Sequence, residues 1–462
     1  MWYNFPVRRC NHYEIEWIDD IGRKFLPRTR VCDIESLITL SPHAVIFLFR
    51  FLVGACTLQV KGAEMLGNRV LWGISTYLAG LVVLDRKRTA TRIAKQFGFV
   101  SHDQLWRLGK LFGDIGLAIN QWWINFLLCF DLTQWWFILD DVLIQKPYAK
   151  WIIGLYNQYD HTQNRHVMGI KLVVVLWTNG KVRVPVAFAI WHAKGFVPRY
   201  RTKNQIARLL IYKLIRCGIP LNESELVCDN WYASKANLRF FERLRISIVT
   251  RLRKNAWVTL DCQRIQLKQL ANLENISSYH YYRCLDAYVK SYIVEYPQVG
   301  AIRVAVVKGD RHAEPGRIKF LIATQLQLSN PQMVQRYRNR WIIELFFRDV
   351  KQHFGIADCQ ARESYQVIFH FRMVFLAALV IDLVTDRDSA KTPLTVEQTI
   401  TNLRTLRVIT VEGLPPALVE IHADGKINPF NWNTLINPVR TYLSANIDDH
   451  IPDTIYDLNI AA

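Results

Sequence analysis

Acidic residues at three separated positions have the type and placing that metal-dependent chemistry requires. Asp140-Asp141 ends the apolar run WWFILDD, Asp229 ends the run in SELVCDN, and Glu344 lies in QRYRNRWIIELFFRDVKQHFG, residues 335–355. Functional groups gather where the strands of an α/β sheet end. We therefore expect neighbouring strands to bring Asp141 and Asp229 together, and the later helix to add Glu344. Carboxylates this close repel one another, and a divalent cation relieves the repulsion.

Such a set of oxygen ligands predicts the kind of ion and the reaction. Carboxylates with open water positions suit Mg²⁺ or Mn²⁺, and we expect two ions. Two ions about 3.5–4 Å apart catalyse in-line displacement at phosphorus, where one activates water or a 3′-hydroxyl and the other stabilises the leaving oxygen. Because this chemistry needs no protein nucleophile, the sequence predicts a phosphoryl-transfer enzyme without an organic cofactor.

Segment 335–355 is predicted to be one amphipathic helix. At 100° per residue a narrow polar stripe contains Tyr337, Arg340, Glu344, Arg348 and Lys351. Large apolar residues occupy the opposite side and would pack on the sheet or on a neighbouring helix. Taken alone, the stripe fits a solvated face whose Arg–Glu pairs contribute only about 0.2–0.5 kcal/mol each. The acids predicted at two strand ends favour a functional site instead.

Four residues of this stripe resemble a known family signature. Tyr337, Arg340, Glu344 and Lys351 match Y-x2-R-x3-E-x6-K without a gap, a spacing typical of bacterial insertion-sequence transposases of the DDE, RNase H-like type. The runs ILDD and VCDN are similar to the first and second aspartate strands of that family. The resemblance covers roughly residues 130–375.

The resemblance implies roles for the matching residues. It implies a metal-binding, catalytic triad of Asp141, Asp229 and Glu344, and contacts of Tyr337, Arg340 and Lys351 with transposon-end DNA near the cleaved phosphate. The first aspartate of the family is usually followed by a hydroxyl residue, whereas Val142 follows Asp141 here. Asp140 therefore stays open as the alternative to Asp141.

The predicted function is metal-dependent cleavage at insertion-sequence ends and transfer of the 3′-hydroxyl ends into target DNA. The resemblance implies double-stranded DNA as the partner, as terminal inverted repeats and target, and a homodimer on two paired ends. One alternative is an RNase H-like nuclease without strand transfer. Another is a catalytically dead DNA-binding repressor, against which the presence of all three carboxylates argues.

Composition agrees with a polyanionic partner. The 462 residues include 58 Lys and Arg against 39 Asp and Glu, a net charge of +19, and such a bias favours nucleic-acid binding. Lys194–Arg216 contains seven cations and no acid, and Lys235–Lys254 contains seven cations and one acid. We expect a DNA path over these segments. The residues predicted to contact DNA, besides those of the family signature, are Arg199, Arg201, Lys203, Lys235 and Arg348.

We expect a cytoplasmic location from two features, the cysteine usage and first residues that lack the apolar core of a signal peptide. None of the nine cysteines falls in a Cys-x-x-Cys pair, so we expect reduced thiols in a cytosolic compartment. The family resemblance implies a bacterial, nucleoid-associated cytoplasmic protein. The uncharged run Val70–Leu84 has 15 residues, short of the roughly 20 that span a bilayer. We expect a buried helix there and no membrane partner.

The predicted fold class is mixed α/β, or α+β, with an RNase H-like mixed sheet. Two apolar runs joined by Asn179-Gly180 predict a β-hairpin, and the core reads β-β-β-α-β-α-β. The predicted domains are a helical N-terminal DNA-binding domain (1–125), the first part of the core (126–253), a β-rich insertion (254–330), the second part with the glutamate helix (331–385), and a C-terminal region assigned to dimerisation (386–462).

The N-terminal segment offers two interpretations. Two short helices are predicted around Gly98, with Ser101 and Gln104 as a capping box at the start of the second. Several cations surround them, which fits either a DNA-binding helix-turn-helix or an ordinary helical hairpin with basic faces. The sequence favours neither.

Overall fold

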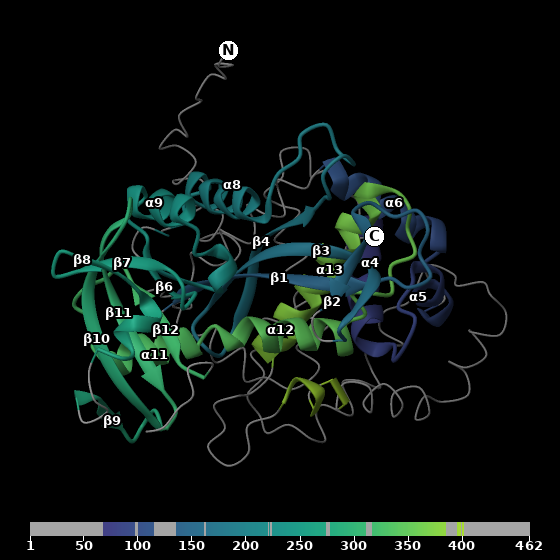
Figure 1. The fold of residues 1–462 in the computed structure, drawn as a ribbon. Coiled ribbons are helices and arrows are strands. Elements are labelled where there is room, and N and C mark those ends of the chain that lie inside the picture. The colour runs from purple at the N-terminus through teal and green to yellow at the C-terminus, as the bar shows by residue number, and fades with distance from the viewer. Residues whose placement is uncertain are drawn as a thin grey trace, which may run out of the picture.

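The structure is a computed structural model that describes residues 68–97, 100–114, 135–160, 163–219, 221, 224–273, 278–310, 317–384, 395–398 and 400–401. Most of the predicted C-terminal region, 386–462, and the first 67 residues lie outside that part of the chain. The described strands form one twelve-stranded mixed sheet, flanked by helices on both faces (Figure 1).

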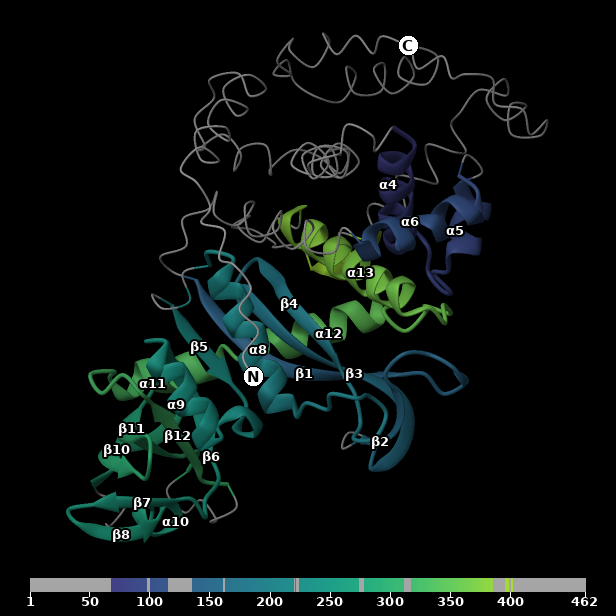
Figure 2. The same ribbon diagram turned by 90° about the horizontal axis from the view of Figure 1, so that it is seen from above.

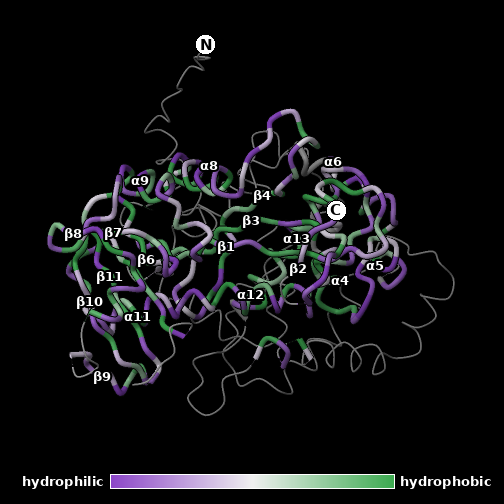
Figure 3. The backbone as a smooth tube through the Cα atoms, viewed as in Figure 1, coloured by the Kyte–Doolittle hydropathy of each residue, from purple (hydrophilic) through white to green (hydrophobic). Residues whose placement is uncertain are grey.

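The first half of the sheet is the predicted mixed core. Its strands are β1 (Trp136–Gln145), β2 (Leu155–Asp160), β3 (Arg165–Thr178), β4 (Arg183–Trp191), β5 (Glu225–Cys228) and β6 (Ser247–Leu252). β1 is antiparallel to β3 and parallel to β5, and β5 is parallel to β6. Hydrophobic residues follow β3 and β4 (Figure 3), and Val173–Trp177 is fully buried. Strands that are covered on both faces have continuous apolar sequences, as β3 and β4 do. The predicted mixed α+β core is confirmed.

The β3–β4 hairpin forms where it was predicted. Gly180 has φ +95°, a conformation that glycine adopts without steric cost. The Asn179 side chain accepts hydrogen bonds from the backbone N–H groups of Lys181 and Val182 at 3.0 Å each. The short polar strand β2 has no counterpart in the predicted order and adds to the edge of β3.

Helices cover the two faces of the sheet. On one face lie α8 (Lys203–Arg216), the 3-10 turn η3 (Asn230–Tyr232) and α9 (Lys235–Arg243); on the other lie α12 (Trp341–Gln352) and α13 (Ser364–Val384). α8 contacts β3 and β4, whereas α12 contacts β1 and β4, and Figure 1 shows them above and below the sheet. α8 begins at Thr202, whose side chain and Gln205 form a capping box.

The segment predicted as an insertion continues the sheet. Its elements are β7 (Trp257–Leu260), β8 (Gln263–Gln266), α10 (Leu267–Leu270), β9 (His280–Tyr282), β10 (Ala287–Tyr296), β11 (Gly300–Lys308) and β12 (Lys319–Ala323). β12 pairs antiparallel with β6, so the hydrogen-bonded order runs β2-β3-β1-β5-β6-β12-β11-β10-β7-β8. A second small core, which includes Val289, Leu321 and Met333, joins these strands to α11 (Asn330–Arg338).

The N-terminal helices pack against the second part of the core. They are α4 (Asn68–Val83), α5 (Ala90–Phe97) and α6 (His102–Asp114), and α4 and α6 contact α13. Figure 2 shows this group at the end of the molecule remote from β7 and β8. Buried Tyr77 bonds His370 of α13 at 2.9 Å. Within the described residues, no helix is both long and apolar enough to cross a bilayer, and α4 is a buried helix as predicted.

The capping box at α6 forms, with Ser101 and Gln104 exchanging hydrogen bonds of 2.8 and 3.2 Å. Arg88, one of the cations close to the two predicted helices, is buried. Its side chain donates to the Leu81 carbonyl and pairs with Asp358. Arg88 therefore connects the N-terminal helices to the core. The helix-turn-helix interpretation of these helices stays a prediction.

Candidate active site

Parallel pairing of β1 and β5 brings the first two acidic positions side by side. Leu139 is in register with Cys228, so Asp140 and Asp229 are the next residues along the two strands. Asp229 follows the last residue of β5, as predicted. The expectation that Asp140-Asp141 ends its strand was wrong, because β1 pairs with β3 as far as Gln145.

Asp140 faces the helix that carries the glutamate. Arg340 donates from Nη1 to Asp140 at 2.8 Å and from Nη2 to Glu344, so one guanidinium joins β1 to α12. Burial, followed by the repulsion of Asp141, raises the pKa of Asp140 to about 7, while Arg340 opposes the rise and Asp229 adds to it. Arg340 therefore joins Asp140 to Glu344, and Asp229 lies close enough to Asp140 to influence its charge.

Asp141 belongs to a different cluster, because successive side chains of a strand point to opposite faces. Lys203, at the start of α8, donates to Asp141 at 2.8 Å, and the Tyr232 hydroxyl donates to the same oxygen at 3.0 Å. Lys171 lies 3.9 Å from the other oxygen. Asp141 is thus held by two cations and a phenol on the α8 face.

The predicted single helix over 335–355 is two helices, so that prediction was wrong. α11 ends at Arg338 and α12 begins at Trp341. Between them, Arg340 and Ile342 donate backbone hydrogen bonds to residues three positions earlier, Tyr337 and Asn339, which tightens the chain into a turn. No glycine or proline marks this break.

The break still leaves Tyr337 beside Arg340, whose guanidinium lies 5.9 Å from the centre of the tyrosine ring. Burial raises the pKa of Tyr337; Arg340 opposes this shift and Asp229 adds to it. Three of the four signature residues, Tyr337, Arg340 and Glu344, therefore meet at the acidic cluster.

The other predicted DNA contacts lie apart from this cluster. Desolvation lowers the pKa of Lys351, and the Asp160 carboxylate of β2 opposes the shift. Arg348 is exposed and pairs with Asp349 at 3.5 Å, whereas the Lys235 ammonium sits 5.2 Å from the ring centre of Tyr296. Arg199 and Arg201 are exposed before α8, and Lys203 is committed to Asp141.

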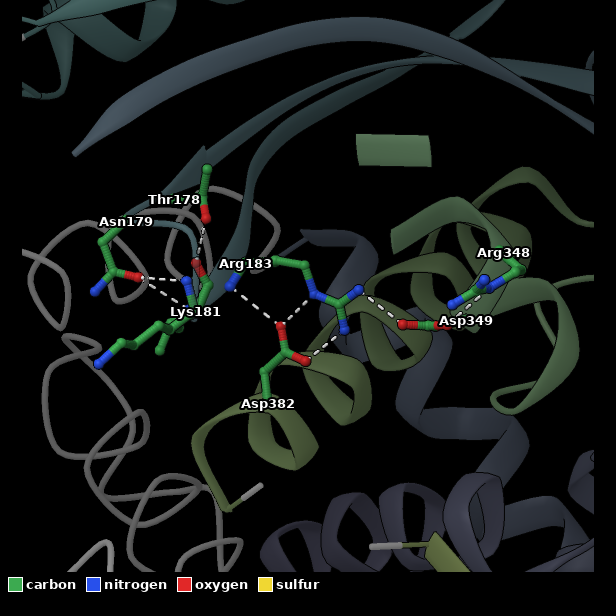
Figure 4. A network of polar contacts seen from close by, with 8 residues as sticks. Thr178, Asn179, Lys181, Arg183, Arg348, Asp349 and Asp382 are labelled. Carbon is green, nitrogen blue, oxygen red and sulfur yellow. Dashed lines mark hydrogen bonds and ion pairs between the residues drawn. The ribbon is translucent and has the colours of Figure 1, made fainter. Parts of the chain in front are cut away.

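A buried ionic network that the sequence did not suggest supports the glutamate helix. Arg183 of β4 donates to Asp349 of α12 at 2.7 Å and to Asp382 of α13 at 2.5 and 2.7 Å (Figure 4). All three side chains are buried. The sequence held one signal for this network: Arg183 is the only charged residue in the apolar run VRVPVAF, and Asp382 is the only one in FLAALVIDLV.

Asp140, Asp229 and Glu344 have the chemistry to bind a divalent cation, but their side chains are not arranged as a metal site. Aspartate and glutamate oxygens are the ligands that Mg²⁺ and Mn²⁺ prefer. Burial, followed by repulsion from Asp141, raises the pKa of Asp140, and a bound cation would favour the charged form of this carboxylate. Among the described residues, however, no group of three or more acidic, histidine or cysteine side chains is arranged to hold a metal. Arg340 occupies the position between Asp140 and Glu344.

Comparison with known families agrees with this geometry. The model of the transposase DDE domain matches residues 133–380, which contain β1, β5 and both helices of the signature. The chain therefore belongs to the DDE transposase family, within the RNase H-like superfamily. A search of curated proteins returned no match.

Proposed function

We propose that this transposase cleaves DNA at the ends of an insertion sequence and joins the freed 3′-hydroxyl ends to target DNA, in a reaction that depends on Mg²⁺ or Mn²⁺. The observation that carries the proposal is the bridge from Arg340 to two carboxylates, one of them 200 positions away in the sequence. A fold that brings carboxylates together supplies oxygen ligands of the kind that hold metal ions for displacement at phosphorus.

For the metal ligands we propose Asp229, Glu344 and, of the two adjacent aspartates, Asp140. Asp140 shares Arg340 with Glu344 and interacts with Asp229. Asp141, which the family resemblance favours, faces Lys203 and Tyr232 on the opposite side of the sheet. Bound cations would activate the attacking oxygen and stabilise the leaving oxygen.

The signature residues then act on the DNA. Arg340 would turn its guanidinium from the two carboxylates to the phosphate, where two parallel N–H bonds fix its orientation. Tyr337 would hold Arg340 from its other side. Lys351 lies seven residues beyond Glu344, about 10 Å along the helix axis, so we assign it a phosphate further along the strand.

The basic segments Lys194–Arg216 and Lys235–Lys254 would carry the flanking DNA, with Arg199, Arg201 and Lys235 as phosphate contacts. Arg348 of α12 would add a phosphate contact on the other face of the sheet. Two copies of the chain would act together on two element ends, and the working protein would be bound to the bacterial chromosome in the cytoplasm. These features follow the family resemblance.

The test is cleavage of a supercoiled plasmid that carries two element ends, with Mg²⁺ or with a chelator. Asp229→Asn and Glu344→Gln are expected to abolish Mg²⁺-dependent strand cleavage, whereas Glu363→Gln, an exposed acid outside the cluster, should cleave like wild type. Strand cleavage that survives Asp229→Asn would contradict the proposal. Cleavage by wild type without joined products would point to a nuclease instead.

A further inference from the structure

A basic and aromatic cavity lies on the outer side of α8, on the sheet face opposite Glu344. It has a volume of about 420 Å³ and opens to solvent, within the range of about 300–1,000 Å³ that is usual for small-ligand sites. Its lining includes Tyr200, Arg201, Gln205, Arg208, Tyr212 and Phe240. The signature residues do not contribute to it.

Charge and ring chemistry together indicate the ligand. Arg201 is exposed, and among the described residues no carboxylate pairs with Arg201 or Arg208. Tyr200 and Tyr212 are 37% and 46% exposed, so their ring faces can be covered by a flat ligand. Cations that bind phosphate beside aromatic rings that stack on bases form the usual surface for single-stranded nucleic acid. A duplex offers no free base face to such rings.

The walls of the cavity are held in place before any ligand binds. The Arg216 guanidinium donates to the Tyr212 hydroxyl at 3.2 Å and lies 5.9 Å from its ring centre. Arg208 donates to Asn237 at 2.5 Å. Side chains fixed in this way lose little further freedom when they bind.

Hydrogen bonds connect the cavity to the strand that carries the aspartates. Buried Asn237, which anchors Arg208, donates to the Tyr232 carbonyl at 3.0 Å, and the Tyr232 hydroxyl donates to Asp141 at 3.0 Å. Tyr232 also belongs to the turn that follows Asp229. The cavity is therefore connected by hydrogen bonds to Asp141, and through the turn containing Tyr232 to Asp229.

We propose that this cavity binds a segment of single-stranded DNA continuous with the strand that reacts, with Arg201 and Arg208 on phosphates and with bases stacked on Tyr200 and Tyr212. The proposal rests on the proposed function in one respect, that DNA is the substrate. It adds a binding site for an unpaired strand on the face of the sheet that the catalytic glutamate does not occupy.

The experiment measures binding of a fluorescein-labelled oligothymidylate of about 12 nucleotides, within the usual site size, to the full-length protein by fluorescence anisotropy. Tyr212→Ala should weaken binding about tenfold and leave the slope of log K against log salt unchanged, because it removes stacking alone. Tyr212→Phe should bind like wild type. Arg201→Gln should weaken binding and reduce that slope by about 0.7, the value for one phosphate contact on a single strand.

Two controls separate this site from other causes. Tyr148→Ala removes a tyrosine that is 95% exposed outside the cavity and should bind like wild type, and circular dichroism should show every variant folded. Asp229→Asn should bind the oligonucleotide like wild type although it does not cleave, so that cleavage tests the proposed function and anisotropy tests the cavity. Unchanged binding by Tyr212→Ala, or equal competition by a duplex of the same length, would overturn the proposal.

Discussion

Replacement of Arg183 by methionine should destabilise the protein more than most single substitutions. The guanidinium is enclosed between β4, α12 and α13 and bonds the carboxylates of Asp349 and Asp382. The exposed fractions of the three side chains are 5, 8 and 1%. Methionine keeps the apolar stem but leaves two buried carboxylates without their shared cation.

The magnitude follows from this burial. Removal of one partner from a buried ion pair costs about 3–5 kcal/mol, because the remaining charge stays desolvated. Two carboxylates lose their partner here, so we expect a loss near the upper end, about 5 kcal/mol. Arg348→Met is the matched control: that side chain is 59% exposed and pairs with Asp349 from the solvent side at 3.5 Å, so its loss should change stability by no more than about 1 kcal/mol.

The assay is urea denaturation at pH 7, with stability taken from the midpoint and the slope of the transition. A loss below about 1 kcal/mol, equal to that of Arg348→Met, would refute the argument that this network fixes the helix carrying Glu344.

Three further predictions concern the acidic cluster, a buried histidine and the N-terminal helices. Asp140→Asn should lower Mg²⁺-dependent cleavage by more than about 100-fold and Asp141→Asn by only about 10-fold, the effect of a supporting contact; the reverse order in a plasmid assay would make Asp141 the ligand. Burial, followed by the charge of Lys146, lowers the pKa of His370 to about 4 in the folded protein. As pH falls from 6.5 to 4, the unfolded chain binds a proton at this histidine before the folded protein does, so the free energy of unfolding of wild type should fall by up to roughly 3 kcal/mol relative to His370→Gln. Above pH 6.5 His370 should have no such effect. If wild type and His370→Gln showed the same pH dependence of stability in urea denaturation, His370 would not be the cause of this loss. Leu78→Ala, at a fully buried position of α4, should cost about 2–5 kcal/mol in a single transition, whereas a separate early transition would show that the N-terminal helices unfold independently.

The core strands could be predicted because their signals are local. Asn179-Gly180 between two apolar runs specifies a hairpin, and its turn has the expected bonds. Asp229 follows a short apolar strand and does end it. Thr202 and Gln205 likewise mark the start of α8 through a capping box.

The predictions that were wrong depended on tertiary contacts. Residues 136–139 of β1 are apolar on both faces, so alternation gave no sign of which face each aspartate takes or of how far β1 continues along β3. The break between α11 and α12 has no glycine or proline, and its C-cap, Asn339, keeps a right-handed helical conformation. Only packing of both helices on the sheet separates them.

Some of the predicted site residues lie together in the structure, and others do not. The spacing of Tyr337, Arg340 and Glu344 indicated residues that do meet, although on two helices. It could not indicate that Lys203, predicted as a DNA contact, bonds Asp141. Nor could spacing reveal the Arg183 network, because its members are distant in sequence and are joined only by the fold.

The most direct test of the central claim is anomalous diffraction from crystals soaked in Mn²⁺. The account predicts manganese peaks about 2.0–2.2 Å from oxygens of Asp229, Glu344 and Asp140, with two ions about 3.5–4 Å apart and with Arg340 moved away from Glu344. Manganese bound elsewhere, or an acidic cluster that takes up no ion while Arg340 keeps both carboxylates, would contradict it.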